Sequence, residues 1–339
     1  MKKIIFIVLL LAMVLAAILA GYFLADVFLA DKSANSQSQS FVVKKGQGVN
    51  EISVNLHAAG LINNQFNFET YLWLLRREGK IQAGEYLLNP QMSLRELTNI
   101  ITYGRATNEK ILTILEGWNN QEIASYLVVS LWPEQDKEKY LADFNLAAQQ
   151  NFDYQFLSSK PAAVDLEGYL FPDTYNFYAS STPEEVVNKM LSNFDQKLAV
   201  DLREEIQKQK KTIHQVVTLA SIIEEEVRTE QDRRLVADIF LRRLAINMAL
   251  QADSTVNYVT GKKMAAISYT DRDIDSPYNT YQNPGLPPGP ICNPGLDSIK
   301  AVVYPITNDY WYFLTTPDGQ VIYSKTLEQH NIAKAKYLK

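Results

Sequence analysis

Three consecutive glutamates, Glu224 to Glu226, end an apolar stretch in the segment LASIIEEEVRTEQDRR. A carboxyl group that is withdrawn from water and lies near another carboxylate has a raised pKa, and it can then donate a proton at neutral pH. The pattern is therefore compatible with general acid–base chemistry. It is equally compatible with a charged, solvated helix end, because acidic runs commonly form such faces.

The glutamates fall at the end of a predicted helix. Thr212 and Gln215 form a T-x-x-Q capping box, and the apolar periodicity after them predicts a helix that runs through Val227. Thr229 is expected to begin the next helix. The apolar face of that second helix comprises Leu235, Val236, Ile239, Phe240 and Leu244.

The three glutamates face different sides of the first helix. Residues three, four and seven apart share a helix face, so Glu225 falls on a polar stripe and should be solvated. Glu224 falls on an apolar stripe beside Ala220, and Glu226 projects toward a pair of isoleucines. Both positions favour a raised pKa, although Arg228, four residues after Glu224, would lower it by pairing with that carboxylate.

Composition and motifs exclude several other classes of protein. The chain has 339 residues and a formal net charge of −5, without a lysine and arginine cluster, so no nucleic-acid partner is expected. The histidines (His57, His214 and His330) are far apart, and neither metal-ligand spacing nor a glycine-rich phosphate loop occurs. We therefore expect no cofactor and no metal. The single Cys292 cannot form an internal disulfide.

The N-terminus predicts a membrane anchor. Lys2 and Lys3 precede an uncharged apolar run from Ile4 to Ala25, which is long enough to cross a bilayer as one helix. The positive N-terminus should remain in the cytoplasm, so that the rest of a single-pass protein of the cytoplasmic membrane lies outside it. A cleaved signal peptide is the alternative, but the run is longer than usual and no clear A-x-A site follows.

The chain after the anchor predicts a small module. Residues 31–40 are polar and small, as in a flexible tether. Residues 41–88 then follow a strand, helix, helix, strand order, with a closing strand near Tyr86. This βααβ order resembles that of LysM-type glycan-binding modules, and a plain α+β spacer is the alternative interpretation.

Further helices and strands are predicted toward the C-terminus. We expect a helix from Ser93, a strand in KILTILEG, a helix after Trp118 and a helix capped by Ser181 or Thr182. The segments YWYFLTT and VIYS flank the turn PDGQ and should form a hairpin before a closing helix.

Several blocks of this sequence resemble one known family. The glutamate region is similar to the signature of the YceG-like endolytic murein transglycosylases, A-S-[IV]-[IV]-E-x-E followed by L-Q-x-D-P-T-V-x-Y-G. Other blocks that resemble the family in the same order are TILEGWNNQEIA, LEGYLFPDTYNFY and SPYNTYQNPGLPPGPICNPG. The resemblance covers essentially the whole chain. It departs from the pattern at Leu115 and Ser254, which stand at proline positions, and at Val259, which stands at a glycine position.

The resemblance implies an enzyme, a lytic transglycosylase of the carbon–oxygen lyase type. Such enzymes cleave the β-1,4 bond between N-acetylmuramic acid and N-acetylglucosamine without water, because the C6 hydroxyl of the muramic acid attacks its own C1. One carboxyl group, as acid and then as base, suffices for this reaction, whereas ordinary glycosidases need two. By matching the motif we expect Glu224 to be catalytic, Glu226 to support it and Glu225 to be dispensable.

The remaining expected site residues are polar side chains near the Pro/Gly-rich loop: Gln251, Asp253, Tyr278, Asn279 and Tyr281. Amides and aromatic rings suit the hydroxyl, acetamido and apolar faces of sugars. Loop packing is the alternative role for the two tyrosines.

The sequence as a whole predicts an α+β protein with a transmembrane anchor (1–30), a linker (31–40), a LysM-like module with a connecting α/β segment (41–160) and a larger mixed catalytic domain (161–339). The implied substrate is the nascent peptidoglycan glycan strand, and peptidoglycan synthases are possible partners by the same resemblance. A non-catalytic, membrane-anchored peptidoglycan-binding or scaffold protein is the alternative function. A two-carboxylate muramidase is a third hypothesis, which predicts reducing ends instead of anhydro ends.

Overall fold

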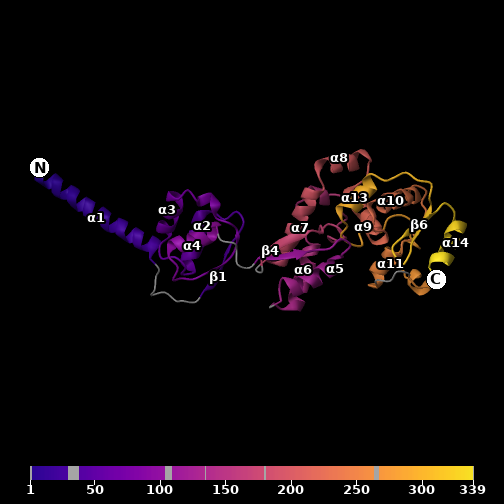
Figure 1. The fold of residues 1–339 in the computed structure, drawn as a ribbon, viewed down its shortest axis with the longest axis horizontal. Helices are drawn as coiled ribbons and strands as arrows, with labels where there is room; N and C mark the ends of the chain where they lie inside the picture. The colour runs from indigo at the N-terminus through magenta and orange to yellow at the C-terminus, as the bar shows by residue number, and fades with distance from the viewer. Residues whose placement is uncertain are drawn as a thin grey trace. The chain divides into compact units, whose positions relative to one another are not determined.

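A computed structural model describes residues 2–29, 38–103, 109–133, 135–178, 181–262 and 267–338. The chain divides into two compact units, which Figure 1 labels by their helices and strands. Unit 1 comprises Met1–Lys110 and Asn176–Ser180, and unit 2 comprises Ile111–Tyr175 and Ser181–Lys339. Most of the expected linker, residues 31–37, lies outside the described residues.

Unit 1 has the predicted βααβ order. Strand β1 (Gln39–Val43) pairs antiparallel with β2 (Gly84–Leu88), and Phe41 lies opposite Tyr86. Between the strands come α2 (Val49–Ala58), α3 (Gln65–Leu74) and the 3-10 turn η1 (Glu78–Lys80). Helix α4 (Leu94–Tyr103) follows β2, so the predictions of the closing strand and of this helix are confirmed.

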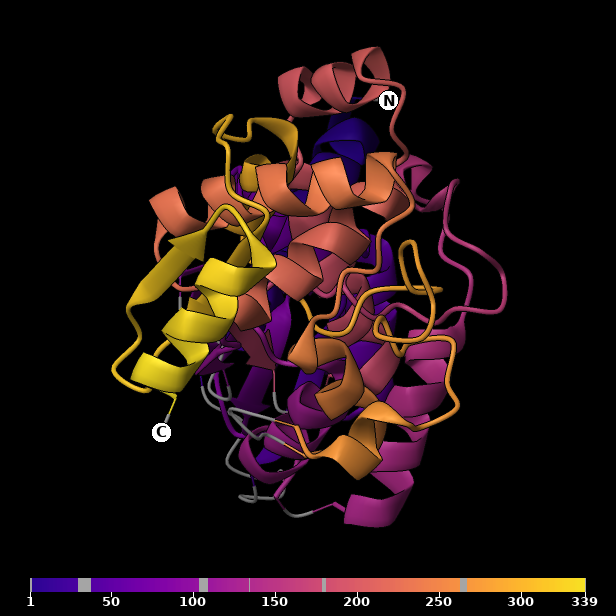
Figure 2. The same ribbon diagram turned by 90° about the vertical axis from the view of Figure 1, so that its right-hand side faces the viewer.

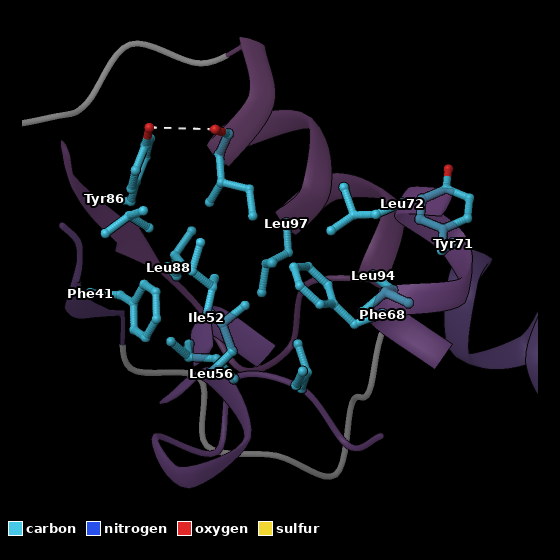
Figure 3. Packing of buried hydrophobic residues seen from close by; sticks show 14 of the residues in the cluster. Phe41, Ile52, Leu56, Phe68, Tyr71, Leu72, Tyr86, Leu88, Leu94 and Leu97 are labelled. Carbon is cyan, nitrogen blue, oxygen red and sulfur yellow. Dashed lines mark hydrogen bonds between the residues drawn. The ribbon is translucent and has the colours of Figure 1, made fainter. Parts of the chain in front are cut away.

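The core of unit 1 forms where the two helices meet the sheet (Figure 3). Ile52 and Leu56 lie one turn apart on α2, and Phe68 and Leu72 do so on α3, so each pair shares the buried face of its helix. All four side chains are fully or almost fully buried. Their contact with the sheet makes the unit a small hydrophobic core of its own.

Helix α1 (Lys2–Phe28) precedes this core. Its last turn belongs to unit 1, because Val27 is completely buried in the core and Asn67 donates a 2.8 Å hydrogen bond to Asp26. Among the residues that the structure describes, no helix has the length and apolarity required to cross a membrane.

Unit 2 contains most of the helices. In chain order these are α5 (Asn120–Ser130), α6 (Lys137–Gln149), η2 (Gln155–Leu157), α7 (Pro183–Lys197), α8 (Val200–Lys208), α9 (Ile213–Glu226), α10 (Glu230–Ala245), α11 (Asp253–Thr260), α12 (Tyr269–Arg272), α13 (Leu296–Val303) and α14 (Leu327–Tyr337). The predicted capping box is present at Thr212, which caps α9. Of the two caps expected for α7, Thr182 is the one observed, and it also forms a capping box. Thr229 caps α10, as its sequence context predicts.

Two strand pairs complete the fold. Strand β3 (Glu109–Thr113) pairs with β4 (Thr174–Tyr178), and β5 (Tyr312–Thr315) pairs antiparallel with β6 (Val321–Ser324). The latter pair is the predicted hairpin, and α14 packs against both of its strands (Figure 2).

Helix α9 is the buried centre of unit 2. It contacts α8, α10, α11 and α13, and every residue from Val216 to Ile223 is buried. Because the helix is covered on several sides, even its polar Thr218 and Ser221 are inside the protein. Its C-terminal turn, which carries the three glutamates, is therefore held by neighbouring elements.

The two units divide the chain at a different position from the expected domains. Residues 111–160 were expected to accompany the first module, but they belong to unit 2. The physical reason is that α6 packs against both α5 and α7, which joins these residues to the larger core.

The unit 1 core yields a stability prediction. Phe68→Ala should lower the free energy of unfolding of unit 1 by about 3–5 kcal/mol, because it empties a fully buried aromatic position. Phe66 on the same helix is 72% exposed, so Phe66→Ala should change the free energy of unfolding of unit 1 by no more than about 0.5 kcal/mol. Native-state hydrogen exchange of peptides from unit 1 in the full chain measures both. Equal losses in the two variants would contradict the packing described.

Candidate active site

The first glutamate of the run, Glu224, lies in a buried ion pair. Its side chain is 4% exposed, and Oε1 accepts a hydrogen bond from the guanidinium of Arg233 on α10, whose side chain is 10% exposed. Its Oε2 accepts the backbone N–H of Gly295 at 3.0 Å, at the start of α13. Both carboxylate oxygens of Glu224 thus accept hydrogen bonds. The cation that pairs with Glu224 is Arg233, whereas the sequence suggested Arg228, which is exposed.

A further carboxylate, Glu116, shares the same arginine. Its Oε2 lies 3.7 Å from the Arg233 guanidinium. Burial and the nearby charge of Glu224 raise the pKa of Glu116, and Arg233 opposes the shift. The position of Gly295 requires a glycine, because a Cβ there would lie 2.0 Å from Oε1 of Glu116. Glu116 was not among the expected site residues, although it belongs to the family-like block TILEGWNNQEIA.

The middle glutamate, Glu225, is exposed, as its place on the polar stripe predicts. It lies beside the turn at Gly117, where an added Cβ would come within 2.7 Å of Oε1 of Glu225. Gly117 has a φ of +80°, a conformation that suits glycine.

The third glutamate, Glu226, lies on another side of α9, at the N-terminus of α11. Its Oε1 accepts hydrogen bonds from the Ser254 hydroxyl at 2.8 Å and from the Ser254 backbone N–H at 3.3 Å. Its backbone carbonyl accepts a 2.9 Å hydrogen bond from Thr315 on β5. As a whole residue, Glu226 has intermediate exposure.

The surroundings of Glu226 favour its neutral form. Burial raises the pKa of Glu226 to about 7, and the charges of Asp253 and Glu225 contribute in the same direction. The two hydrogen bonds from Ser254 act in the opposite sense, because they favour the carboxylate. A carboxyl group with this pKa can both donate and accept a proton near neutral pH.

Two of the expected polar residues meet beside Glu226. The Tyr281 hydroxyl donates a hydrogen bond to Oδ1 of Asp253, the residue before Ser254. Burial is the main cause that raises the pKa of Tyr281, and Asp253 and Glu226 reinforce it. Buried Arg243, whose guanidinium donates to the carbonyls of Leu250 and Trp311, interacts electrostatically with both Glu226 and Tyr281.

The other expected residues have different surroundings. Gln251 is exposed, with a φ of +52°, and its backbone N–H donates to Thr280. Tyr278 packs on the Tyr258 ring with the centroids 5.1 Å apart, and burial raises the pKa of Tyr278 to about 12. Both side chains remain candidates for contact with a ligand.

Asn279, in contrast, supports the loop. Its side chain is completely buried, and its amide nitrogen donates to the carbonyls of Arg272 and Ile274, both at 2.9 Å. Its Oδ1 accepts the backbone N–H of Tyr281. Because the amide is used by the backbone, the expectation that Asn279 contacts a sugar does not fit its geometry.

A buried polar network that sequence analysis did not single out joins three of the quoted blocks. Glu167 accepts the backbone N–H of Asn120 and the side-chain amide of Asn293, each at 3.1 Å. Asn293 also accepts the N–H of Leu170 at 2.8 Å. Burial raises the pKa of Glu167 well above its usual range. This network fixes the segments that carry Glu116 and Gly295.

Comparison with known proteins identifies the family. The model of the YceG-like family matches residues 41–336, which is most of the chain. The chain belongs to this family. A solved structure of a YceG-like protein from Listeria monocytogenes is 34% identical, covers 88% of this chain and 100% of its own, and has a TM-score of 0.57.

Two relatives of this chain carry the name endolytic murein transglycosylase. The Bacillus subtilis protein is 35% identical over 309 residues, which cover 87% of this chain and 84% of the relative. The Streptococcus pneumoniae strain R6 protein is 31% identical over 354 residues and 96% of this chain. This YceG-like chain spans only 64% of the length of the pneumococcal relative.

The ion pair of Glu224 yields the second prediction. Arg233→Met should destabilise unit 2 by about 3–5 kcal/mol, because it leaves a buried carboxylate without its cation. Adding Glu224→Gln should recover part of this loss, since a neutral amide needs no counter-ion. Urea denaturation followed by tryptophan fluorescence measures the effect, because three of the four tryptophans, Trp118, Trp132 and Trp311, lie in unit 2. Strictly additive losses would show that the two side chains are not coupled.

Proposed function

We propose that this protein is an endolytic lytic transglycosylase that cleaves the β-1,4 bond between N-acetylmuramic acid and N-acetylglucosamine in peptidoglycan strands. We further propose that Glu226 is its acid and base. The observation that carries the proposal is the carboxyl group of Glu226, whose pKa burial raises to about 7 and whose Oε1 accepts both hydrogen bonds from Ser254 at the start of α11. Membership of the YceG-like family supports the substrate class.

The proposed reaction needs only one carboxyl group. Neutral Glu226 gives its proton to the glycosidic oxygen as the bond to C1 breaks, and N-acetylglucosamine departs with a free hydroxyl. The C6 hydroxyl of the muramic acid forms the new bond to C1 and transfers its proton to the Glu226 carboxylate. The carboxyl group is thereby regenerated and the product has a 1,6-anhydro end. No water is consumed, so no second carboxylate is required as nucleophile or water-activating base.

The contacts favour Glu226 over Glu224 as the acid and base. Glu224 would have to abandon both the buried Arg233 and the Gly295 N–H before it could give a proton to a sugar. Its ion pair with Arg233 suits a structural role. The sequence-based assignment of the catalytic role to Glu224 stays a prediction. The variants described below distinguish it from the assignment to Glu226.

The neighbours of Glu226 suggest how the substrate is held. Asp253 and Tyr281 both interact electrostatically with the proposed acid, and the pair can bind sugar hydroxyl groups. Gln251 offers an exposed amide and Tyr278 a partly exposed aromatic face. Asn279 would act only by holding the loop in shape.

The N-terminal half suggests how the enzyme is placed. We propose that the apolar segment 4–25 anchors the chain in the cytoplasmic membrane, with the N-terminus inside and both units outside. The βααβ module of unit 1 is then a LysM-like module that holds glycan strands near the membrane. This position would let the enzyme cut nascent strands beside the synthases that extend them.

The products of uncrosslinked glycan strands test the acid directly. Glu226→Gln in the full chain should lower the yield of 1,6-anhydro ends by roughly 100-fold or more, because an amide cannot donate the proton. Glu225→Gln should retain activity, since its side chain is exposed. Mass spectrometry of the products measures both.

The same assay separates the competing hypotheses. Loss of activity in Glu224→Gln with an active Glu226→Gln would restore the sequence-based assignment. Reducing ends in place of anhydro ends would indicate a muramidase. Intact strands from the unmodified protein, with binding retained, would indicate a scaffold protein.

The pKa of Glu226 predicts a pH profile. The acid must be protonated in the free enzyme, so kcat/KM should fall about tenfold per pH unit above a pH of about 7. The fall follows from deprotonation of a group whose pKa is raised, and activity should be kept just below that pH. Initial rates on glycan strands measure the profile. A kcat/KM that stays constant to about pH 9 would be incompatible with this acid.

A further inference from the structure

We propose that Ser254 is a positioning residue that fixes the Glu226 carboxyl group at the start of α11 and thereby sets the pH range in which the enzyme works. This inference rests on the proposed function, because it concerns the residue proposed as acid. It adds a residue that makes no contact with the reacting bond and acts through Glu226.

The geometry singles out one oxygen of the carboxyl group. The Ser254 hydroxyl at 2.8 Å and the Ser254 backbone N–H at 3.3 Å both reach Oε1 of Glu226. No other hydrogen bond to the carboxyl oxygens of Glu226 occurs among the described residues. Oε2 is therefore the oxygen that is free to carry and transfer the proton.

Two donors on Oε1 stabilise the charged form of the group. The N–H belongs to the first turn of α11, where backbone donors have no partner within the helix and the helix dipole favours a negative charge. The hydroxyl adds a second donor from the same residue. Both effects keep the pKa of Glu226 lower than burial alone would place it.

The other charged and titratable groups around Glu226 come from several elements. Asp253 belongs to α11, Glu225 to α9, Arg243 to α10 and Tyr281 to the loop after α12. All four remain when Ser254 is replaced. A change in the pH profile of a Ser254 variant therefore reports the lost donors.

Position 254 also allows the two donors to be removed stepwise. Ser254→Ala removes the hydroxyl and keeps the N–H. Ser254→Pro removes both, and proline is tolerated in the first turn of a helix because the N–H there is not needed within the helix. Ser254→Thr keeps both donors and serves as the conservative replacement.

The experiment is the pH dependence of kcat/KM for the full chain on uncrosslinked glycan strands. In Ser254→Ala, the pH above which kcat/KM falls (the alkaline limb) should rise by about one unit, and in Ser254→Pro it should rise further. Hydrogen bonds to charged groups are strong enough for such shifts. Ser254→Thr should restore the original limb. Ser268→Ala is the matched control, since Ser268 donates to the Asp271 carboxylate at the start of α12 instead.

The outcomes separate this inference from the proposed function. A lower rate at every pH with an unshifted limb in Ser254→Ala would overturn the inference, because that is the result of a merely structural role. An upward shift in Ser254→Ala supports it even if Ser254→Pro fails to fold. Activity in Glu226→Gln would instead overturn the assignment of the acid, whatever the Ser254 variants do.

Discussion

The site depends on the way the C-terminal turn of α9 meets the N-terminal turns of two other helices. Carboxylates at the C-terminus of a helix oppose its dipole, so the run Glu224 to Glu226 would be unfavourable in an isolated helix. In the protein, Glu224 accepts an N–H from the start of α13 and Glu226 accepts one from the start of α11. The positive ends of these helices compensate for the unfavourable position.

The two carboxylates differ because, among the described residues, Glu224 forms an ion pair and Glu226 does not. Glu224 is paired with Arg233 and fixes α9 against α10 and α13. Glu226 lies two residues further, on another side of the helix, where Ser254 offers hydrogen bonds but no charge. Two positions of one motif thus acquire different roles: Glu224 forms a structural ion pair, and the pKa of Glu226 is raised to about 7.

Local features of this site could be predicted from the sequence. The capping box at Thr212, the end of α9 and the exposure of Glu225 follow from patterns within a few residues. The partners of the glutamates could not be predicted, because Arg233, Gly295 and Ser254 approach from other elements. From spacing alone, Arg228 was the expected cation beside Glu224. The boundary between the two units differs from the expected domain boundary for the same reason, since the packing of α6 on α7 is a tertiary contact.

The central claim is that the titrating carboxyl group of this site is Glu226. Infrared difference spectroscopy of the full chain between about pH 6 and about pH 8 tests it directly, because a neutral carboxyl group absorbs separately from a carboxylate. We predict that the loss of neutral-carboxyl absorption over this range is the same in the unmodified protein and in Glu224→Gln, and is smaller by one carboxyl group in Glu226→Gln, because Glu116 and Glu167 also have raised pKa values. A loss that is unchanged in Glu226→Gln and smaller in Glu224→Gln would contradict the account.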